Sequence, residues 1–161
     1  MTPRSFYHRL TGIENLSFFA SLDDLHAGIA AIRIKNVVDI VGLGAAAQRP
    51  VRTYSRGMQQ KLGLARALLR DPAVLLLDLL DEPTKSLDPR AAEEFWRFLR
   101  GTLAREMKKT ILMVTHNLQE ARSCDRVAFM YGGRVAAIGE WCDVESHIRR
   151  HGFEEEIVAR A

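Results

Sequence analysis

The feature that most constrains the fold of this chain is a short apolar run that ends in acidic residues. Residues 74–80 are hydrophobic on both faces of a strand except at Asp78, and the run continues into Asp81 and Glu82. A strand that is apolar on both faces is typical of a parallel strand covered by helices. Residues 110–114 form a second run of this kind. Because a helix-length segment separates the two runs, the sequence predicts an α/β fold with a parallel sheet.

The segment before the first strand is predicted to be helical. Thr11 and Glu14 have the spacing of a capping box, and Gly42 is a natural helix end. Ser55 is a good N-cap, and Asp71 followed by proline ends the helix that Ser55 opens. The expected order is a helix to about residue 22, a helix over 25–41, a loop over 44–53 and a helix from Ser55 to Asp71.

The remaining elements are predicted after the first strand. Asn117 and Glu120 have the spacing of a second capping box, and two glycines between strand-like runs predict a hairpin. The expected order is a long helix from Pro89 to about residue 107, the strand at 110–114, a helix from Asn117, a hairpin over 126–138 and an amphipathic helix from Trp141 to the end.

Composition and charge argue against several classes of protein. A net charge of +3 over 161 residues does not predict binding to nucleic acid or to a membrane surface. Cys124 and Cys142 lack metal-ligand spacing and are expected to be reduced thiols of a cytoplasmic protein. No secretory signal is expected, because no apolar run follows the first nine residues. The longest apolar stretch, residues 73–77, is far shorter than the roughly 20 residues of a membrane helix, so any work at a membrane requires a partner.

Three features suit phosphate chemistry, although none establishes a site alone. A Ser55 N-cap followed by Gly57 leaves backbone N–H groups at the positive end of a helix, but most helices that begin with Ser bind nothing. A strand that ends in Asp-Glu places one carboxylate near Mg²⁺ and the next where it can polarise water, but such a pair is more often an acidic turn. A lone histidine at a strand end, such as His116, is usually a satisfied polar residue.

Four motifs occur in a fixed order: Ser55-Arg56-Gly57-Met58-Gln59-Gln60, Asp81-Glu82-Pro83-Thr84, Ser86-Leu87-Asp88 and Thr115-His116-Asn117. Together they resemble the second half of an ATP-binding cassette, the nucleotide-binding domain of ABC transporters. The first motif resembles the family's signature, with Arg56 in place of a Gly and Met58 in the place of a Gln. The run that follows, Gln-Gln-Lys-Leu-Gly-Leu-Ala-Arg-Ala-Leu over residues 59–68, matches the family closely. The resemblance extends from Phe6 to about Trp141.

The resemblance implies that two motifs act across a dimer interface. The signature residues would contact the γ-phosphate of nucleotide held by the opposite subunit; they are Ser55, Arg56, Gly57, Met58 and Gln59. Ser86 and Asp88 belong to the D-loop, from which Asp88 would reach the partner subunit.

The resemblance also implies catalytic roles. Asp81 would hold Mg²⁺ through water, and Glu82 would be the general base that activates the attacking water. His116 would contact the γ-phosphate and sense hydrolysis.

The acidic end of the first strand carries a three-residue tandem duplication, Leu-Leu-Asp-Leu-Leu-Asp. Asp78 lies 23 residues after Ser55, the offset that the family shows, and Asp81 lies 26 residues after it. Three residues of strand span about 10 Å, and an odd shift turns every side chain to the opposite face.

Two arrangements could accommodate the duplication. In one, the extra residues loop out before the strand, so that Asp81 and Glu82 are correctly placed and Asp78 is buried in mid-strand, which is costly unless it is neutral or paired. In the other, Asp78 takes the metal position and Leu79 falls where the base should be. The first is favoured because Asp81 and Glu82 lead directly into the D-loop.

The sequence contains no Gly, four residues, Gly-Lys-Ser/Thr run, which is the Walker A loop that cradles phosphates in this family. The family's Q-loop glutamine is also missing just before Ser5. We therefore expect the C-terminal portion of a cassette, with signature, Walker B, D-loop and H-loop but no Walker A. Its remaining strands should expose an edge and an apolar face.

The predicted fold is a partial P-loop NTPase-like α/β fold, a parallel sheet with a helical signature subdomain. The expected domains are that subdomain over residues 1–71, the C-terminal half of the ATPase core over 72–140 and a C-terminal helix over 141–161. The predicted function is a truncated ATP-binding subunit of an ABC transporter. Residues 10–20 look most like subunits of exporters.

The intact subunit is expected to couple Mg-ATP hydrolysis to transport, with ATP and Mg²⁺ bound only if the missing half is supplied. Its expected partners are a transmembrane permease subunit and a second nucleotide-binding subunit in a head-to-tail dimer. Nucleic acid is not expected. These partners would place the chain in the cytoplasm, peripheral to the membrane through the permease.

Two alternatives stay open. One is a non-catalytic remnant or regulatory half-cassette that does not bind ATP alone, favoured by the missing phosphate loop and by the duplication. The other is a DNA-repair or translation ATPase, which shares the motifs but usually carries long inserts or coiled coils that this sequence lacks.

Overall fold

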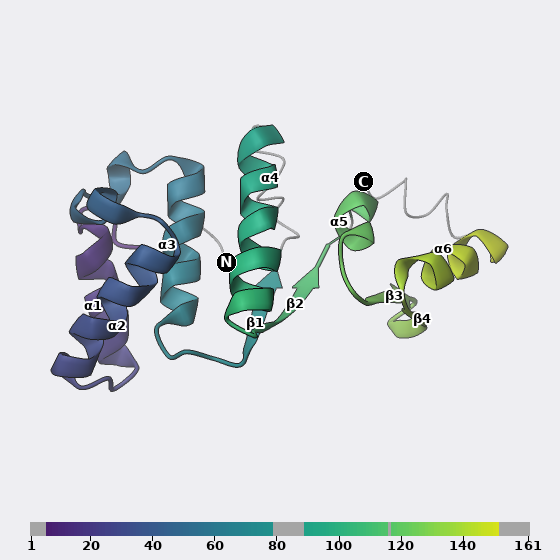
Figure 1. The fold of residues 1–161 in the computed structure, drawn as a ribbon, viewed down its shortest axis with the longest axis horizontal. Helices are drawn as coiled ribbons and strands as arrows, with labels where there is room; N and C mark the ends of the chain where they lie inside the picture. Colours follow the sequence, from purple (N-terminus) through teal and green to yellow (C-terminus); the bar gives the residue numbers. More distant parts are fainter. Residues whose placement is uncertain (1–5, 79–88, 116, 152–161) are drawn as a thin grey trace. The chain divides into compact units, whose positions relative to one another are not determined.

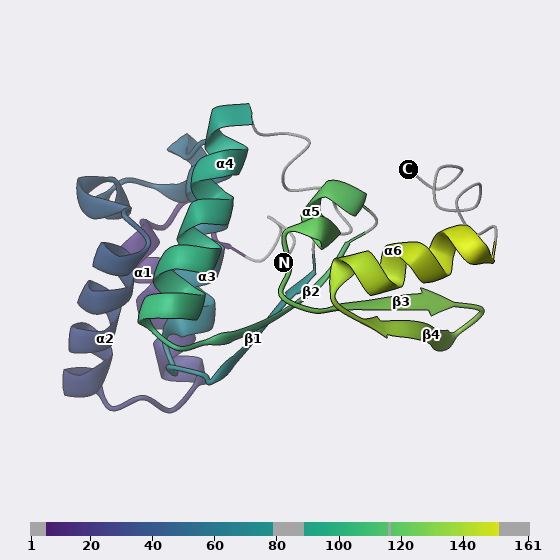
Figure 2. The same ribbon diagram turned by 45° about the vertical axis from the view of Figure 1, so that its right-hand side comes forward.

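The computed structural model describes residues 6–78, 89–115 and 117–151, drawn as ribbons in Figures 1 and 2. The chain divides into two units, Met1–Met113 and Val114–Ala161, which we describe one at a time. The helices of the first unit are α1 (Gly12–Leu22), α2 (Ala27–Ile40), the 3₁₀ helices η2 (Gly44–Gln48) and η3 (Val51–Thr53), α3 (Arg56–Leu68), α4 (Pro89–Arg97) and the π-helix η4 (Phe98–Glu106). None of the helices in these described ranges is long and apolar enough to cross a membrane.

Helices α1 and α2 form where the local sequence predicts them. Thr11 Oγ1 accepts the Glu14 N–H at 3.1 Å, and the Glu14 carboxylate accepts the Thr11 N–H at 2.7 Å, so the predicted capping box is confirmed. Helix α2 ends at Ile40, and Gly42 follows with a φ of +65°. A left-handed residue at this place closes the helix end at low cost only when it is glycine.

The predicted loop over residues 44–53 contains two short 3₁₀ helices, η2 and η3, instead. The Tyr54 hydroxyl fixes them by donating to the Ala46 carbonyl at 2.8 Å. The same hydroxyl lies against Gly12, where a Cβ atom would collide with it. Contacts with α1 therefore shape this segment, and they are invisible in its local sequence.

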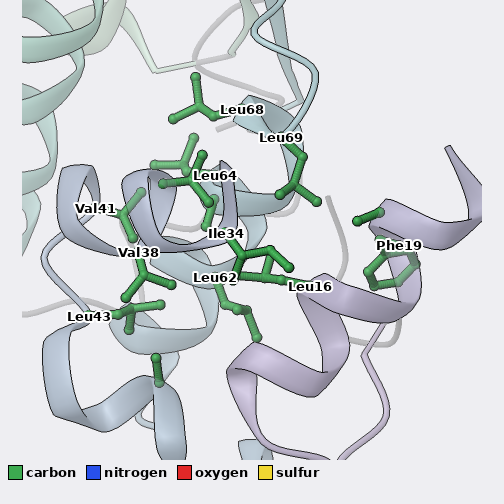
Figure 3. Packing of buried hydrophobic residues seen from close by; sticks show 14 of the residues in the cluster. Leu16, Phe19, Ile34, Val38, Val41, Leu43, Leu62, Leu64, Leu68 and Leu69 are labelled. Carbon is green, nitrogen blue, oxygen red and sulfur yellow. The ribbon is translucent and has the colours of Figure 1, made fainter. Parts of the chain in front are cut away.

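Helices α1, α2 and α3 share one apolar core, shown in Figure 3. Leu16 of α1 and Leu62 of α3 are fully buried, and Ile34 of α2 is 6% exposed. Each such side chain contributes about 1.5–3 kcal/mol by leaving water. Leu99 and Leu103 of η4 belong to the same cluster, so the predicted long helix contributes to the core that the helices before the first strand form. Its change to π-helical pitch at Phe98 was not predicted.

The sheet of the first unit pairs β1 (Val74–Asp78) with β2 (Thr110–Val114). The two strands run in the same direction (Figure 2). Leu75 is buried, and Leu77, Ile111 and Met113 pack against the core. The opposite face is open: Leu76 is 71% exposed, and Val74 and Leu112 are exposed with it. The expected apolar, uncovered face is therefore present.

The second unit contains α5 (Leu118–Arg122), β3 (Val127–Tyr131), β4 (Arg134–Gly139) and α6 (Trp141–Arg150). Strands β3 and β4 form the predicted antiparallel hairpin. Gly132 and Gly133 connect them with φ values of +56° and +75°, the left-handed pair that a two-residue hairpin turn requires. Val144 and Ile148 of α6 are buried, which gives this unit its own small core.

Candidate functional site

The start of α3 is the best-defined part of the predicted site. Ser55 is the N-cap, and its Oγ accepts the Met58 N–H at 3.2 Å. Its carbonyl accepts the Gln59 N–H at 3.0 Å. An α-helix leaves the N–H groups of its first turn without intrahelical acceptors. Ser55 satisfies that of Met58, which leaves those of Arg56 and Gly57 directed out of the helix end.

The rest of α3 anchors this end in the core. Leu62 is fully buried, and Leu64, Ala65 and Leu68 are buried beside it, while Ser55 and Arg56 are exposed. The five predicted signature residues thus lie together at one cap and first turn, held by an apolar base. The arrangement can present backbone donors and a partial positive charge to an anion.

Arg56 stands where the family's signature has a Gly, and it adds a positive charge to this helix end. Its side chain is exposed, and a guanidinium at a helix N-terminus adds positive charge where the dipole already favours anions. Arg56 therefore keeps the electrostatic potential at this helix end positive, which is the sign that attracts a phosphate group.

The predicted acidic residues are only partly described. Asp78 is the last described residue of β1, whereas Asp81, Glu82, Ser86 and Asp88 lie outside the described residues. Their predicted roles stay predictions. Within the described residues, no group of three or more His, Cys, Asp or Glu side chains could hold a metal ion.

His116 lies outside the described residues, but its neighbours are defined. The Thr115 hydroxyl donates to the carboxylate of Glu120, which is 6% exposed. Thr115 Oγ1 in turn accepts the Asn117 N–H at 3.0 Å, and Asn117 Oδ1 accepts the Gln119 N–H at 2.9 Å. The N-cap at Asn117 is confirmed, but its side chain accepts the N–H of Gln119, whereas the predicted capping box requires the N–H of Glu120. These hydrogen bonds fix the described residues on either side of position 116.

An ion pair that sequence reasoning missed lies at the connection from α3 to β1. Lys109 Nζ donates to Asp71 Oδ1 at 2.6 Å and to the Asp71 carbonyl at 3.4 Å. Arg33 of α2 lies 3.5 Å from the other carboxylate oxygen. The hydrogen bond from Lys109 lowers the pKa of Asp71, and Arg33 lowers it further. These residues are far apart in sequence, so no spacing rule could have found them.

Asn15 is a second polar residue whose role only the structure shows. It is fully buried. Its Oδ1 accepts the Tyr7 N–H at 2.8 Å, and its Nδ2 donates to the carbonyls of Tyr7 and Thr11 at 3.0 and 2.9 Å. Asn15 therefore fixes the segment that leads into α1.

Comparison with known proteins agrees with the motif order. The sequence profile of the family described as "ABC transporter" matches residues 4–85, which is half of the chain. The chain is 42% identical to the uncharacterized ABC transporter ATP-binding protein YdbJ of Bacillus subtilis over 133 residues. It is 43% identical, again over 133 residues, to a fluoroquinolones export ATP-binding protein of Mycobacterium tuberculosis. In both comparisons the match covers 82% of this chain and 41% of the relative, so the chain spans about two fifths of the length of these relatives.

Solved structures show the same fold. The chain resembles cbiO1 from Clostridium perfringens, described as part of the ABC transporter complex cbiONQ, with a TM-score of 0.76 and 27% identity. That match covers 94% of this chain and 61% of cbiO1. It also resembles the ATP-binding cassette MJ0796, described as a dimer bound to ADP and Pi, with a TM-score of 0.67 and 25% identity over 88% of this chain and 61% of that one. The chain belongs to the ABC transporter family, as a partial ATP-binding cassette.

Proposed function

We propose that this chain is the signature-bearing part of an ATP-binding subunit of an ABC exporter. The observation that carries the proposal is the capped, exposed start of α3, where the signature residues follow Ser55. Two relatives are named as export proteins, one for fluoroquinolones and one for Nod factor. These names support an export role.

The proposed site is shared between two subunits. Ser55, Arg56 and Gly57 would meet the γ-phosphate of ATP held by a second nucleotide-binding subunit, with Met58 and Gln59 supporting the turn. A helix N-terminus is suited to this because its free N–H groups and dipole favour negative charge. The solved cassette MJ0796, a dimer bound to ADP and Pi, supports pairing of two such subunits, for which we propose a head-to-tail arrangement. A permease subunit would be the membrane partner.

The second half of the proposed chemistry requires residues outside the described ranges. Glu82 is proposed as the base that activates water, His116 as the γ-phosphate contact, and Ser86 and Asp88 as the D-loop. Mg²⁺ would supply charge neutralisation at the transferring phosphoryl group when bound with ATP. This activity belongs to a complete cassette, because a sequence without the phosphate-cradling loop lacks the main source of phosphate contacts.

One observation favours the rival function, a non-catalytic or regulatory half-cassette. Val74, Leu76 and Leu112 leave an apolar sheet face uncovered in the described residues, as expected of a cassette that lacks the part covering it. Such a chain would dock on a transporter without hydrolysing ATP.

A complete cassette tests the proposed function. The phosphate-loop segment of a relative such as YdbJ is joined to this chain, and ATP turnover is measured for Ser55→Arg. Turnover should fall by about tenfold or more, since an oversized side chain displaces the anion-binding turn from the transition state. ATP binding to the isolated cassette should be unchanged, because the contact is made to the other subunit's nucleotide. Ser21→Arg, at an exposed serine of α1, is the matched control, and equal turnover in the two variants would contradict the proposal.

A further inference from the structure

We infer that His147 and His151 form a two-imidazole site for a divalent transition cation of the class of Zn²⁺, Ni²⁺ and Cu²⁺. His147 lies in the last turn of α6, and His151 is the C-cap of that helix. The sequence holds five histidines, at positions 8, 26, 116, 147 and 151, and this pair alone has a spacing of four. Residues four apart lie one above the other on the same face of a helix. The site is independent of the proposed function, because it uses none of the signature residues.

The two imidazole rings already lie together. Their centroids are 4.2 Å apart, and the ring planes are inclined by 29° in a stacked arrangement. A metal–nitrogen bond of a Zn²⁺ site is about 2.0–2.1 Å long, so two nitrogens on one cation are about 3 Å apart. Stacked rings reach that geometry by side-chain rotation alone, which is fast at a protein surface.

A hydrogen bond sets the tautomer of His151. Its Nδ1 lies 2.9 Å from the His147 carbonyl oxygen. A carbonyl oxygen only accepts, so Nδ1 carries the proton in this contact, and in the neutral ring Nε2 carries the lone pair. Histidines that ligate metals commonly donate their other ring N–H to a backbone carbonyl, which orients the ring and raises its basicity. His151 therefore makes the backbone contact of a metal ligand.

The helix that carries the pair is well packed. Helix α6 contacts both strands of the β3–β4 hairpin (Figure 2), and Val144 and Ile148 are buried. His147 is half-buried beside them, and His151 is exposed to solvent. A pair held on one packed helix binds a cation more tightly than two independent imidazoles, because the second contact is intramolecular.

The arginines next to the pair are engaged by other groups. Arg149 forms an ion pair with Glu145 at 2.9 Å, and Arg150 Nε donates to the Ser146 carbonyl at 3.3 Å. Both contacts hold the guanidinium groups against the preceding turn of α6. The ion pair also neutralises the charge of Arg149, so it reduces the repulsion that a bound cation would meet.

Two imidazoles fill only part of a coordination shell. Asp143 is exposed one turn before His147, but the described residues contain no group of three ligands that could hold a metal ion. Water or a group from another molecule would complete the shell. Imidazole suits Zn²⁺, Cu²⁺ and Ni²⁺, whereas Mg²⁺ takes oxygen ligands. The site therefore differs in chemistry from the Mg²⁺ site proposed with ATP.

Calorimetric titration of NiCl₂ into the untagged 161-residue chain tests the site. Cys124 and Cys142 are changed to Ser in every protein, because thiols compete for the cation. We expect one Ni²⁺ per chain. His147→Gln and His151→Gln should each raise the dissociation constant at least about tenfold, since each leaves a single ligand. His26→Gln, at an exposed histidine that precedes α2, is the matched control and should leave the dissociation constant unchanged.

A spacing variant distinguishes a site from a mere number of histidines. His147→Gln combined with Arg150→His keeps five histidines but puts two of them in adjacent positions, which do not face each other on a helix. Its dissociation constant should match that of His147→Gln. Recovery of the original value would overturn the inference, and so would an unchanged dissociation constant in either single variant.

If a variant does not fold, paramagnetic broadening in the unsubstituted chain decides the question. Substoichiometric Cu²⁺ should broaden the ring proton signals of His147 and His151 before those of His8 and His26. Equal broadening of all four would overturn the inference. None of these readouts involves ATP, so a failure of the proposed function would leave the result at this site intact.

Discussion

Single polar residues fix the parts of this chain that surround the candidate site. From a fully buried position, Asn15 hydrogen-bonds four backbone groups of Tyr7, Leu10 and Thr11. Asp71 takes a left-handed φ of +54° and joins Lys109 and Arg33. Asn15 lies in the first turn of α1 and Asp71 between α3 and β1. Each holds a chain connection by polar contacts that apolar packing cannot supply.

The Asp71 ion pair predicts a pH dependence of stability. The pKa of Asp71 is lowered in the folded chain, chiefly by the hydrogen bond from Lys109. A depressed pKa contributes stability above the unfolded value of about 3.9 and loses it as the pH falls through the folded value. Asp71→Asn should therefore lower the free energy of unfolding at neutral pH by at most about 1 kcal/mol, since the carboxylate is half exposed and screened. The difference should shrink below about pH 4.

Urea unfolding of the two proteins across this pH range measures the effect. Asp24→Asn serves as a control, because Asp24 also has a positive φ and its side chain is exposed. A difference between Asp71→Asn and the unsubstituted chain that stays constant down to acidic pH would contradict the assignment.

At the scale of elements, the two-stranded sheet of the first unit has one buried face and one exposed face. Leu75 is 3% exposed and packs in the core, whereas Leu76 is 71% exposed. The strand is apolar on both faces, yet only one is covered within the described residues. A strand that is apolar on both faces is typical of a sheet covered on both sides. We therefore expect residues outside the described ones to cover the exposed face.

Matched substitutions on the two faces test this arrangement. Leu76→Lys should change the free energy of unfolding by no more than about 0.5 kcal/mol, as at an ordinary exposed position. It should also raise solubility, because it removes part of an exposed apolar patch. Leu75→Lys should cost about 4 kcal/mol or more, because it buries an unpaired charge. Chemical denaturation and light scattering provide the readouts, and similar losses in both variants would mean that both faces are covered.

The sequence predicts those features of the elements that depend on residues close together in the chain. The capping box at Thr11, the Ser55 cap and the glycine turn at 132 and 133 were predicted, because each depends on residues within four positions. The 3₁₀ helices at 44–53, the π-helical pitch of η4 and the Lys109 contact were not, because they depend on distant neighbours. Among the predicted site residues, the described ones are those at the start of α3 and, for its backbone, Asp78.

At the scale of the whole molecule, the chain is a partial cassette. It spans 41% of YdbJ and 61% of cbiO1, and its 161 residues contain the signature but no phosphate-cradling run. We propose that the signature end of α3 meets a nucleotide that a second subunit holds. The central claim is a division of labour, in which another part of the transporter holds the phosphates and the signature of this chain recognises them.

Calorimetric titration of Mg-ATP into the 161-residue chain tests that claim most directly. The account predicts no binding in the low-micromolar range, because backbone donors at one helix end cannot replace a loop that surrounds the phosphates. A complete cassette that includes the phosphate loop of a relative is the positive control and should bind. A low-micromolar dissociation constant for the chain alone would contradict the account.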